Sequence, residues 1–232
     1  KWLESIDLPS SVTTLKRNAF FGCQRLVSVQ LPSQLQVVPS CCFASCTSLQ
    51  TITIPASVNA ISSDAFKSCN ALSSFVVEAG NTVYCSYDDV LYTADSTQIV
   101  AFPQGKTGSH TTPMPLVHLP AQSIAGASID TLYLPGVQTI DARAIASCGA
   151  LKAVFLSETV ENIVRNAFSQ NGGLVAIHVA EQNAHYLSLD GVLYSKDTTV
   201  LLKYPEAKPI PLRDDHALIP TIHDSVRVIA SY

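Results

Sequence analysis

The chain has 232 residues, of which 47% are hydrophobic and 14% are charged, and its formal net charge is −4. This balance excludes an intrinsically disordered chain, because disordered chains carry few apolar and many charged residues. The small negative charge and the lack of any Lys- or Arg-rich run argue against nucleic-acid binding. No apolar stretch approaches the roughly 18 residues that a membrane-spanning helix needs, so we expect no direct membrane insertion.

The first 80 residues repeat with a period of 23 residues. The dipeptides Leu8-Pro9, Leu31-Pro32 and Ile54-Pro55 keep this spacing, as do three further sets: Phe20, Phe43 and Phe66; Cys23, Cys46 and Cys69; Leu26, Leu49 and Leu72. The short alternating segment before each dipeptide predicts a β-strand, which ends at the proline because proline has no N–H to donate. One unit cannot bury its own apolar face, so we expect stacked units with a parallel sheet along one side.

Two segments interrupt the repeat and match each other at an offset of 102 residues. We call them the first island (residues 81–106) and the second island (residues 183–206). Within them Val90-Leu91-Tyr92 matches Val192-Leu193-Tyr194. In the first island two apolar stretches flank a polar turn at Ala94–Thr97, and the second has the same arrangement, which is typical of a β-hairpin.

The repeat resumes after the first island. Leu134-Pro135, Leu156-Ser157 and Val179-Ala180 stand in the Leu-Pro position, Ile145 and Phe168 in the Phe position, and Cys148 and Asn171 in the Cys position. Residues 107–130 are the least regular, and Leu119-Pro120 and Ile219-Pro220 indicate an incomplete unit after each island. The predicted organisation is a repeat block (1–80), the first island, an irregular unit with a second block (107–182), the second island, and the start of a truncated repeat (207–232).

Both ends of the chain fall inside a repeat. Val226 and Ile229 match Val12 and Leu15, which precede Ala19-Phe20 by a few residues. An Ala-Phe pair is therefore expected just beyond Tyr232, and the chain is predicted to be part of a longer protein.

These motifs resemble a known family. The unit I-P-x-x-V-x-x-I-x-x-x-A-F-x-x-C-x-x-L at Ile54–Leu72 and the motif N-x-x-Y-x-x-x-D-G-V-L-Y at Asn183–Tyr194 are similar to those of BspA-like leucine-rich-repeat surface proteins. The first island carries Asp89 where that motif has glycine. The resemblance implies one continuous leucine-rich-repeat solenoid, a right-handed α/β-type superhelix with short parallel strands and a 3₁₀ or irregular convex side, interrupted here by two β-hairpin islands.

The resemblance also implies a structural role for the Cys position. In such repeats this side chain bonds to the backbone of the neighbouring unit, so we expect a ladder along the stack formed by Cys23, Cys46, Cys69, Cys148 and Asn171. Stacked strands would bring equivalent residues about 4.8 Å apart, within reach of a disulfide, but side chains that point the same way disfavour one. No cysteine pair has the spacing of a zinc site, and no metal or cofactor is expected.

The two motifs that resemble catalytic or nucleotide-binding sequences are both incomplete. Gly105-Lys106-Thr107 lacks the glycine that a phosphate-binding loop needs five residues earlier, and His223-Asp224 has no partner nucleophile. The resemblance implies a secreted or surface-attached protein that adheres to host cells, matrix proteins or other microbial surface proteins. We therefore expect a non-enzymatic extracellular or cell-surface protein-binding module. The alternatives are a structural spacer of a surface protein and an intracellular scaffold, for which free thiols would be suited.

Solenoids usually bind partners with the sheet face. Four large side chains occupy outward-facing strand positions and are the candidate ligand-binding residues: Val76, Tyr133, Phe155 and His178. Exposed aromatic side chains on a sheet are candidate anchors for a protein ligand. The competing interpretation is that a neighbouring island folds over these side chains and that they are ordinary packing.

Overall fold

The computed structural model describes residues 2–209 and 222–230. Within these ranges the chain forms short strands and turns and contains no helix. It divides into two compact units, Lys1–Thr107 and Gly108–Tyr232, and the division falls at the end of the first island.

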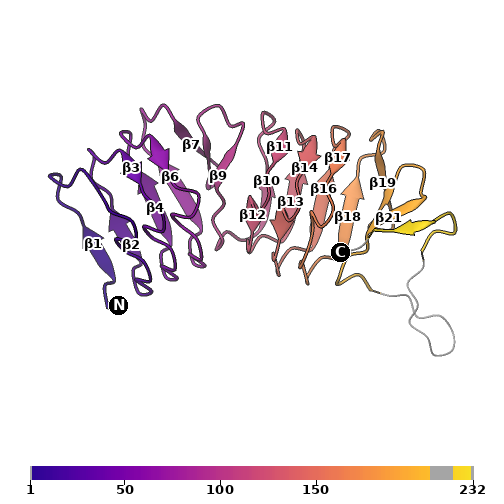
Figure 1. The fold of residues 1–232 in the computed structure, drawn as a ribbon, viewed down its shortest axis with the longest axis horizontal. Coiled ribbons are helices and arrows are strands. Elements are labelled where there is room, and N and C mark those ends of the chain that lie inside the picture. The colour runs from indigo at the N-terminus through magenta and orange to yellow at the C-terminus, as the bar shows by residue number, and fades with distance from the viewer. Residues whose placement is uncertain (1, 210–221, 231–232) are drawn as a thin grey trace. The chain divides into compact units, whose positions relative to one another are not determined.

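The first unit carries three repeat coils and the first island (Figure 1). Its strands are β1 (Ser5–Asp7), β2 (Ser28–Gln30), β3 (Val37–Val38), β4 (Thr51–Ile54), β5 (Ala60–Ile61), β6 (Ser74–Val77), β7 (Tyr84–Tyr87), β8 (Val90–Thr93) and β9 (Ile99–Ala101). Parallel pairs β1–β2 and β4–β6 form one side of the stack, and β3–β5 forms a second.

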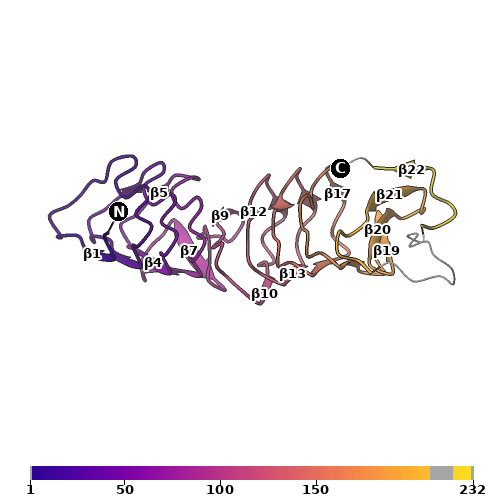
Figure 2. The same ribbon diagram turned by 90° about the horizontal axis from the view of Figure 1, so that it is seen from below.

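In the second unit the strands of the coils lie on three sides of the stack (Figure 2). Its strands are β10 (Ser109–Thr111), β11 (His118–Leu119), β12 (Ile124–Ala125), β13 (Thr131–Leu134), β14 (Thr139–Ile140), β15 (Ile145–Ala146), β16 (Ala153–Leu156), β17 (Asn162–Ile163), β18 (Ala176–Val179), β19 (Tyr186–Leu189), β20 (Val192–Ser195), β21 (Val200–Lys203) and β22 (Val228–Ile229). The first side is β10-β13-β16-β18, the second is β11-β14-β17, and the third is β12-β15.

The expected irregular unit at 107–130 is a regular coil in the structure. Its strands β10, β11 and β12 each pair in parallel with the corresponding strand of the next coil. It is slightly short, since Ser109 pairs with Thr131 and His118 with Thr139, spacings of 22 and 21 residues. The incomplete unit expected at Ile219-Pro220 lies outside the described residues.

A solenoid of stacked parallel strands is confirmed, but the α/β character and the 3₁₀ segment are wrong for the described residues. The reason lies in the segments around the Phe position, which form the third side of the stack. Residues with a left-handed backbone conformation recur there, such as Asn18 (φ 61°) and Gly22 (φ 68°). They divert alternate N–H groups out of the coil. Phe20 N–H donates to Cys42 O of the next coil at 2.9 Å, whereas Phe21 N–H donates back to Asn18 O at 3.1 Å. A 3₁₀ helix would need every N–H to bond within its own segment.

The Phe position forms the centre of the core in the first unit. The ring of Phe43 is fully buried and lies between those of Phe20 and Phe66, with centroid distances of 5.2 and 5.7 Å and nearly parallel planes. Each Phe therefore packs against its equivalents one coil away, which explains why the spacing is kept.

The Cys position bonds across coils. Cys46 Sγ donates to Phe20 O and Cys69 Sγ to Phe43 O, both at 3.1 Å, and Cys148 Sγ donates to Ile124 O at 3.1 Å. Asn171 makes two such bonds, since its Nδ2 donates to Ile145 O and its Oδ1 accepts Cys148 N–H, both at 2.9 Å. Cys23 is half-buried and packs against the same core. All seven cysteines are free thiols.

Each island is a three-stranded antiparallel meander, one strand more than the hairpin that the sequence predicts. The order is β7-β8-β9 in the first island and β19-β20-β21 in the second, where β22 adds in parallel. The added strands are β7 and β19, which pair antiparallel with β8 and β20. Asp89 (φ 65°) adopts the same left-handed conformation as its counterpart Gly191 (φ 76°), so both islands turn alike.

The islands attach to the edge of the first side of the stack. Asp89 O accepts Phe75 N–H at 2.8 Å, and Ser86 Oγ donates to Phe75 O at 2.6 Å. The second island repeats this on β18, where Gly191 O accepts Ile177 N–H at 2.9 Å and Ser188 Oγ donates to Ile177 O at 2.6 Å. Each island thus satisfies backbone groups that an edge strand would otherwise leave open.

Candidate interaction surface

The outward face of sheet β10-β13-β16-β18 brings three predicted site residues together. Its strands pair in parallel with Tyr133 opposite Phe155 and Phe155 opposite His178. Because side chains alternate along a strand, all three lie on the face opposite to the buried Leu132, Val154 and Ile177. We call Tyr133, Phe155 and His178 the aromatic row.

The rings of the aromatic row are stacked. The centroids of Tyr133 and Phe155 lie 4.6 Å apart with an interplanar angle of 16°, and those of Phe155 and His178 lie 4.6 Å apart at 17°. This spacing matches that of neighbouring strands, so the sheet itself sets the stack. Since the ring faces cover each other, the row offers mainly ring edges and polar tips to a ligand.

The row stays accessible in its own unit. The side chain of Tyr133 is 38% exposed, that of His178 is exposed, and Phe155 between them is half-buried. The second island joins β18 at its edge, through the backbone of Ile177, and does not cover these rings. A ligand could therefore reach the row without displacing the island.

Val76 belongs to the other compact unit. It lies on β6, opposite Thr53 of β4, and its side chain is 46% exposed. The outward positions that share its place in the coil are polar in the preceding strands: Asp7, Gln30 and Thr53. Val76 is a single exposed apolar side chain on a polar face, which is ordinary for a soluble surface.

The ionisable groups with shifted pKa values have structural partners. Asp64 accepts from Ser40 Oγ at 2.8 Å, Ser62 Oγ at 2.9 Å and the Cys41 thiol at 3.2 Å, and these bonds hold the pKa of its carboxyl below the usual range. Such a carboxylate stays charged at neutral pH and is a poor general acid. Among the described residues no group of three or more His, Cys, Asp or Glu could hold a metal ion.

The buried thiols are unreactive by their environment. Burial raises the pKa of Cys42 and of Cys46 to about 12 and that of Cys69 to about 11. Because the thiolate is the nucleophile, these cysteines have little reactivity at neutral pH.

Lys106 illustrates how a motif-like residue acquires a structural role. Its Nζ is nearly buried and lies 3.2 Å from Asp88 Oδ1 and 3.3 Å from Asp89 Oδ2. The equivalent Lys208 Nζ lies 2.7 Å from Asp190 Oδ2. In each case a lysine that follows the third strand forms an ion pair with an aspartate in the first turn of the island. Lys106 therefore has a structural role, and no phosphate-binding function is needed to explain it.

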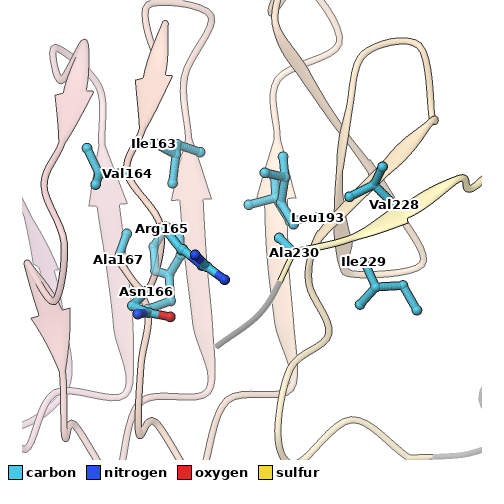
Figure 3. A pocket seen from close by; sticks show the side chains of 11 residues that line it. Ile163, Val164, Arg165, Asn166, Ala167, Leu193, Val228, Ile229 and Ala230 are labelled. Carbon is cyan, nitrogen blue, oxygen red and sulfur yellow. The ribbon is translucent and has the colours of Figure 1, made fainter.

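The sequence did not reveal an apolar groove in the second unit. It is lined by the coil segment 163–168, by residues 228–230, and by Leu193 and Leu202 of the second island, and Figure 3 shows Leu193 between the two segments. One feature of the sequence indicates the groove. The repeat unit that contains Phe168 is followed by the second island and not by another repeat unit.

The chain matches the family model described as BspA type Leucine rich repeat region (6 copies) over residues 1–107 and 118–188. The chain belongs to this family. The match covers most of the sequence and agrees with the spacing of the stacked coils. A search of curated proteins found no match.

Solved structures of bacterial proteins share the fold. The pneumococcal vaccine antigen PcpA is 25% identical with a TM-score of 0.61, and the match covers 78% of this chain and 51% of that one. A leucine rich cell surface protein of Faecalibacterium prausnitzii is 20% identical with a TM-score of 0.51, covering 77% and 60%. A leucine-rich repeat protein of Eubacterium ventriosum is 16% identical with a TM-score of 0.51, covering 76% and 60%. This chain thus spans about half to three fifths of their lengths. No helix among the described residues is long and apolar enough to cross a membrane.

Proposed function

We propose that this chain is a non-enzymatic, surface-displayed repeat module that binds a protein ligand through the aromatic row. The observation that carries the proposal is the exposed stack of Tyr133, Phe155 and His178 on one sheet face. The ligand class is a host-cell surface protein, an extracellular-matrix protein or another microbial surface protein.

The stacking is favourable for binding. Ordering a flexible side chain at an interface costs roughly 0.5–1.5 kcal/mol, and rings that are already packed against each other avoid much of this loss. Tyr and other aromatic residues are also enriched among the few side chains that dominate binding energy. The rings extend over three adjacent strands, β13, β16 and β18, so one flat partner surface can contact all of them.

Surface display is supported by the family and by two of the structural neighbours. One neighbour is described as a vaccine antigen and another as a cell surface protein. The buried cysteines Cys46 and Cys69 are compatible with an oxidising exterior, because burial raises their pKa and so keeps them as thiols.

The test is a binding assay on the full chain with Tyr133→Ser, Phe155→Ser and His178→Ser combined. The matched control combines Met114→Ser and Val117→Ser, which are 64% and 46% exposed in the same unit and lie outside the row. The probes are immobilised extracellular-matrix proteins and cultured epithelial cells.

The proposal expects saturable binding that falls by about tenfold or more in the row variant and is unchanged in the control. Unchanged binding in the row variant would move the site to another face. The absence of saturable binding to every probe would favour the alternatives, a structural spacer or an intracellular scaffold.

A further inference from the structure

The outward face of sheet β10-β13-β16-β18 carries a second row of side chains beside the aromatic row. On each strand the outward position two residues before that row holds a small side chain: Ser109, Thr131, Ala153 and Ala176. We call these four residues the small row. The four strands are neighbours in one sheet, so both rows run along the stack and across the strands (Figure 1). Because the rings are larger than the side chains of the small row, the two rows form a step.

This face carries no Lys, Arg, Asp or Glu. The eight outward positions of the four strands hold Ser109, Thr111, Thr131, Tyr133, Ala153, Phe155, Ala176 and His178. A charged ligand group placed on such a face loses hydration and gains no opposite charge in return. We therefore expect the ligand segment that contacts this face to be uncharged.

The hydroxyl groups of this face have no partner inside the described chain. Within residues 2–209 and 222–230 no hydrogen bond joins the side chain of Thr111, Thr131 or Tyr133 to another group of the protein. The first unit differs, because Thr51 Oγ1 and Ser74 Oγ lie at the positions equivalent to the small row and bond to each other at 3.0 Å. The second unit thus keeps hydrogen-bond donors beside its rings for a ligand that has open acceptors.

The spacing of the rings favours one backbone conformation in the ligand. Two steps of 4.6 Å separate the ring of Tyr133 from that of His178, which is about 9 Å along the stack. A polyproline II helix has three residues per turn and a rise of about 3.1 Å, so it presents the same side to a surface about every 9 Å. A β-strand presents the same side about every 7 Å and an α-helix about every 5.4 Å, and neither matches one or two steps of this stack.

We propose that the aromatic row and the small row together bind an uncharged, proline-rich segment of the protein ligand in the polyproline II conformation. This inference rests on the proposed function and names the chemistry of its ligand. The segment lies along the stack, across β13, β16 and β18. One proline packs on the small row beside the ring edge of Tyr133, and a second proline, three residues away, packs beside that of His178.

The backbone of the segment supplies the acceptors that this face lacks. A polyproline II helix has no internal hydrogen bonds, so its carbonyl groups are open. They accept from Tyr133 Oη and from Thr131 Oγ1. Aromatic side chains are an established receptor for proline-rich segments, because such segments are already ordered before they bind.

The test titrates the full chain with a capped decaproline peptide, which carries no charge and favours the polyproline II conformation, and follows the backbone amides by NMR. Ala153→Arg places a long charged side chain in the small row and leaves the three rings in place. The matched control is Ser28→Arg, at the equivalent strand position of the first unit, where the side chain is exposed. A capped ten-residue Gly-Ser peptide, which is uncharged and flexible, is the control ligand.

The inference expects saturable shifts of the amides of the aromatic row and none at Thr53, which lies at the equivalent outward position of the first unit. The affinity should fall by about tenfold or more in Ala153→Arg and stay unchanged in Ser28→Arg. The Gly-Ser peptide should show no saturable binding. No saturable binding of decaproline, or equal binding of the two peptides, would overturn the inference.

Tyr133→Phe provides a second variant that keeps the ring stack and removes only the hydroxyl group. Loss of one hydrogen bond to a carbonyl should weaken decaproline binding by about fivefold. Unchanged affinity in both Ala153→Arg and Tyr133→Phe would refute binding at the two rows.

The decaproline titration and the binding assay of the proposed function fail separately. If the row variant loses binding to matrix proteins or cells but decaproline does not bind, the aromatic row is the site and the proline-rich ligand is wrong. If decaproline binds at the two rows while the row variant still binds the matrix proteins and cells, the proposed function is wrong and this inference stands.

Discussion

Phe43→Ala is expected to destabilise the first unit strongly. Phe43 is fully buried between Phe20 and Phe66, at 5.2 and 5.7 Å between ring centroids. Removing a buried phenylalanine side chain costs about 3–5 kcal/mol of unfolding free energy, which includes the cavity left behind. Because the substitution breaks two ring stacks at once, we expect the upper half of that range.

The assay is thermal unfolding followed by circular dichroism, with urea titration for the free energy. At roughly 4–8 °C per kcal/mol for a unit of this size, the melting temperature of the first unit should fall by about 15 °C or more. The matched control is Phe21→Ala, one residue along, whose side chain is 57% exposed and whose loss should change the unfolding free energy by less than about 0.5 kcal/mol. If Phe43→Ala melts with the control, the stacked core is misplaced.

Asn171→Ala should lower the free energy of unfolding by about 2–4 kcal/mol in a urea titration, because it leaves Cys148 N–H and Ile145 O buried without partners. Asn171→Cys should recover part of this loss, since Cys46 and Cys69 occupy the equivalent position in other coils. Equal losses in the two variants would contradict the ladder. Burial raises the pKa of Cys46 to about 12 from an ordinary value of 9.0. The folded chain therefore keeps the proton that the unfolded chain loses, so stability is full below about pH 9 and should fall between pH 9 and 12, and a flat unfolding free energy across that range would argue against buried thiols.

The sequence predicts the repeat side of this fold well because packing enforces it. The stacked rings of Phe20, Phe43 and Phe66 need the same residue at the same spacing, so the core positions can be predicted from the repeat in the sequence. The outward positions of Tyr133, Phe155 and His178 could be predicted for the same reason, since they follow from the register of the buried positions, while their role in ligand binding stays a prediction.

Other features depend on contacts that leave little pattern. The third side avoids 3₁₀ structure through left-handed residues such as Asn18, Ser45 and Ser68, and a non-glycine residue gives no sign of positive φ in advance. The ion pair of Lys106 with Asp88 joins the end of the first island to its first turn, and these residues lie 18 apart in the sequence. The groove beside Phe168 is lined by residues that lie far apart in the sequence, from Ile163 to Ala230, so only the three-dimensional arrangement reveals it.

A protein ligand that binds through the aromatic row must contact Tyr133, Phe155 or His178. The most direct measurement places a photo-cross-linking amino acid at position 133 or, as the control, at position 114, and irradiates each full-length protein bound to epithelial cells. Tyr133 and Met114 are both exposed in the second unit, 38% and 64%, so the two reporters differ in location and both reach solvent. Saturable cross-links from position 133, competed by unlabelled protein, with none from position 114 are the predicted result. Equal cross-linking from both positions, or cross-linking from position 114 alone, would contradict binding through the aromatic row.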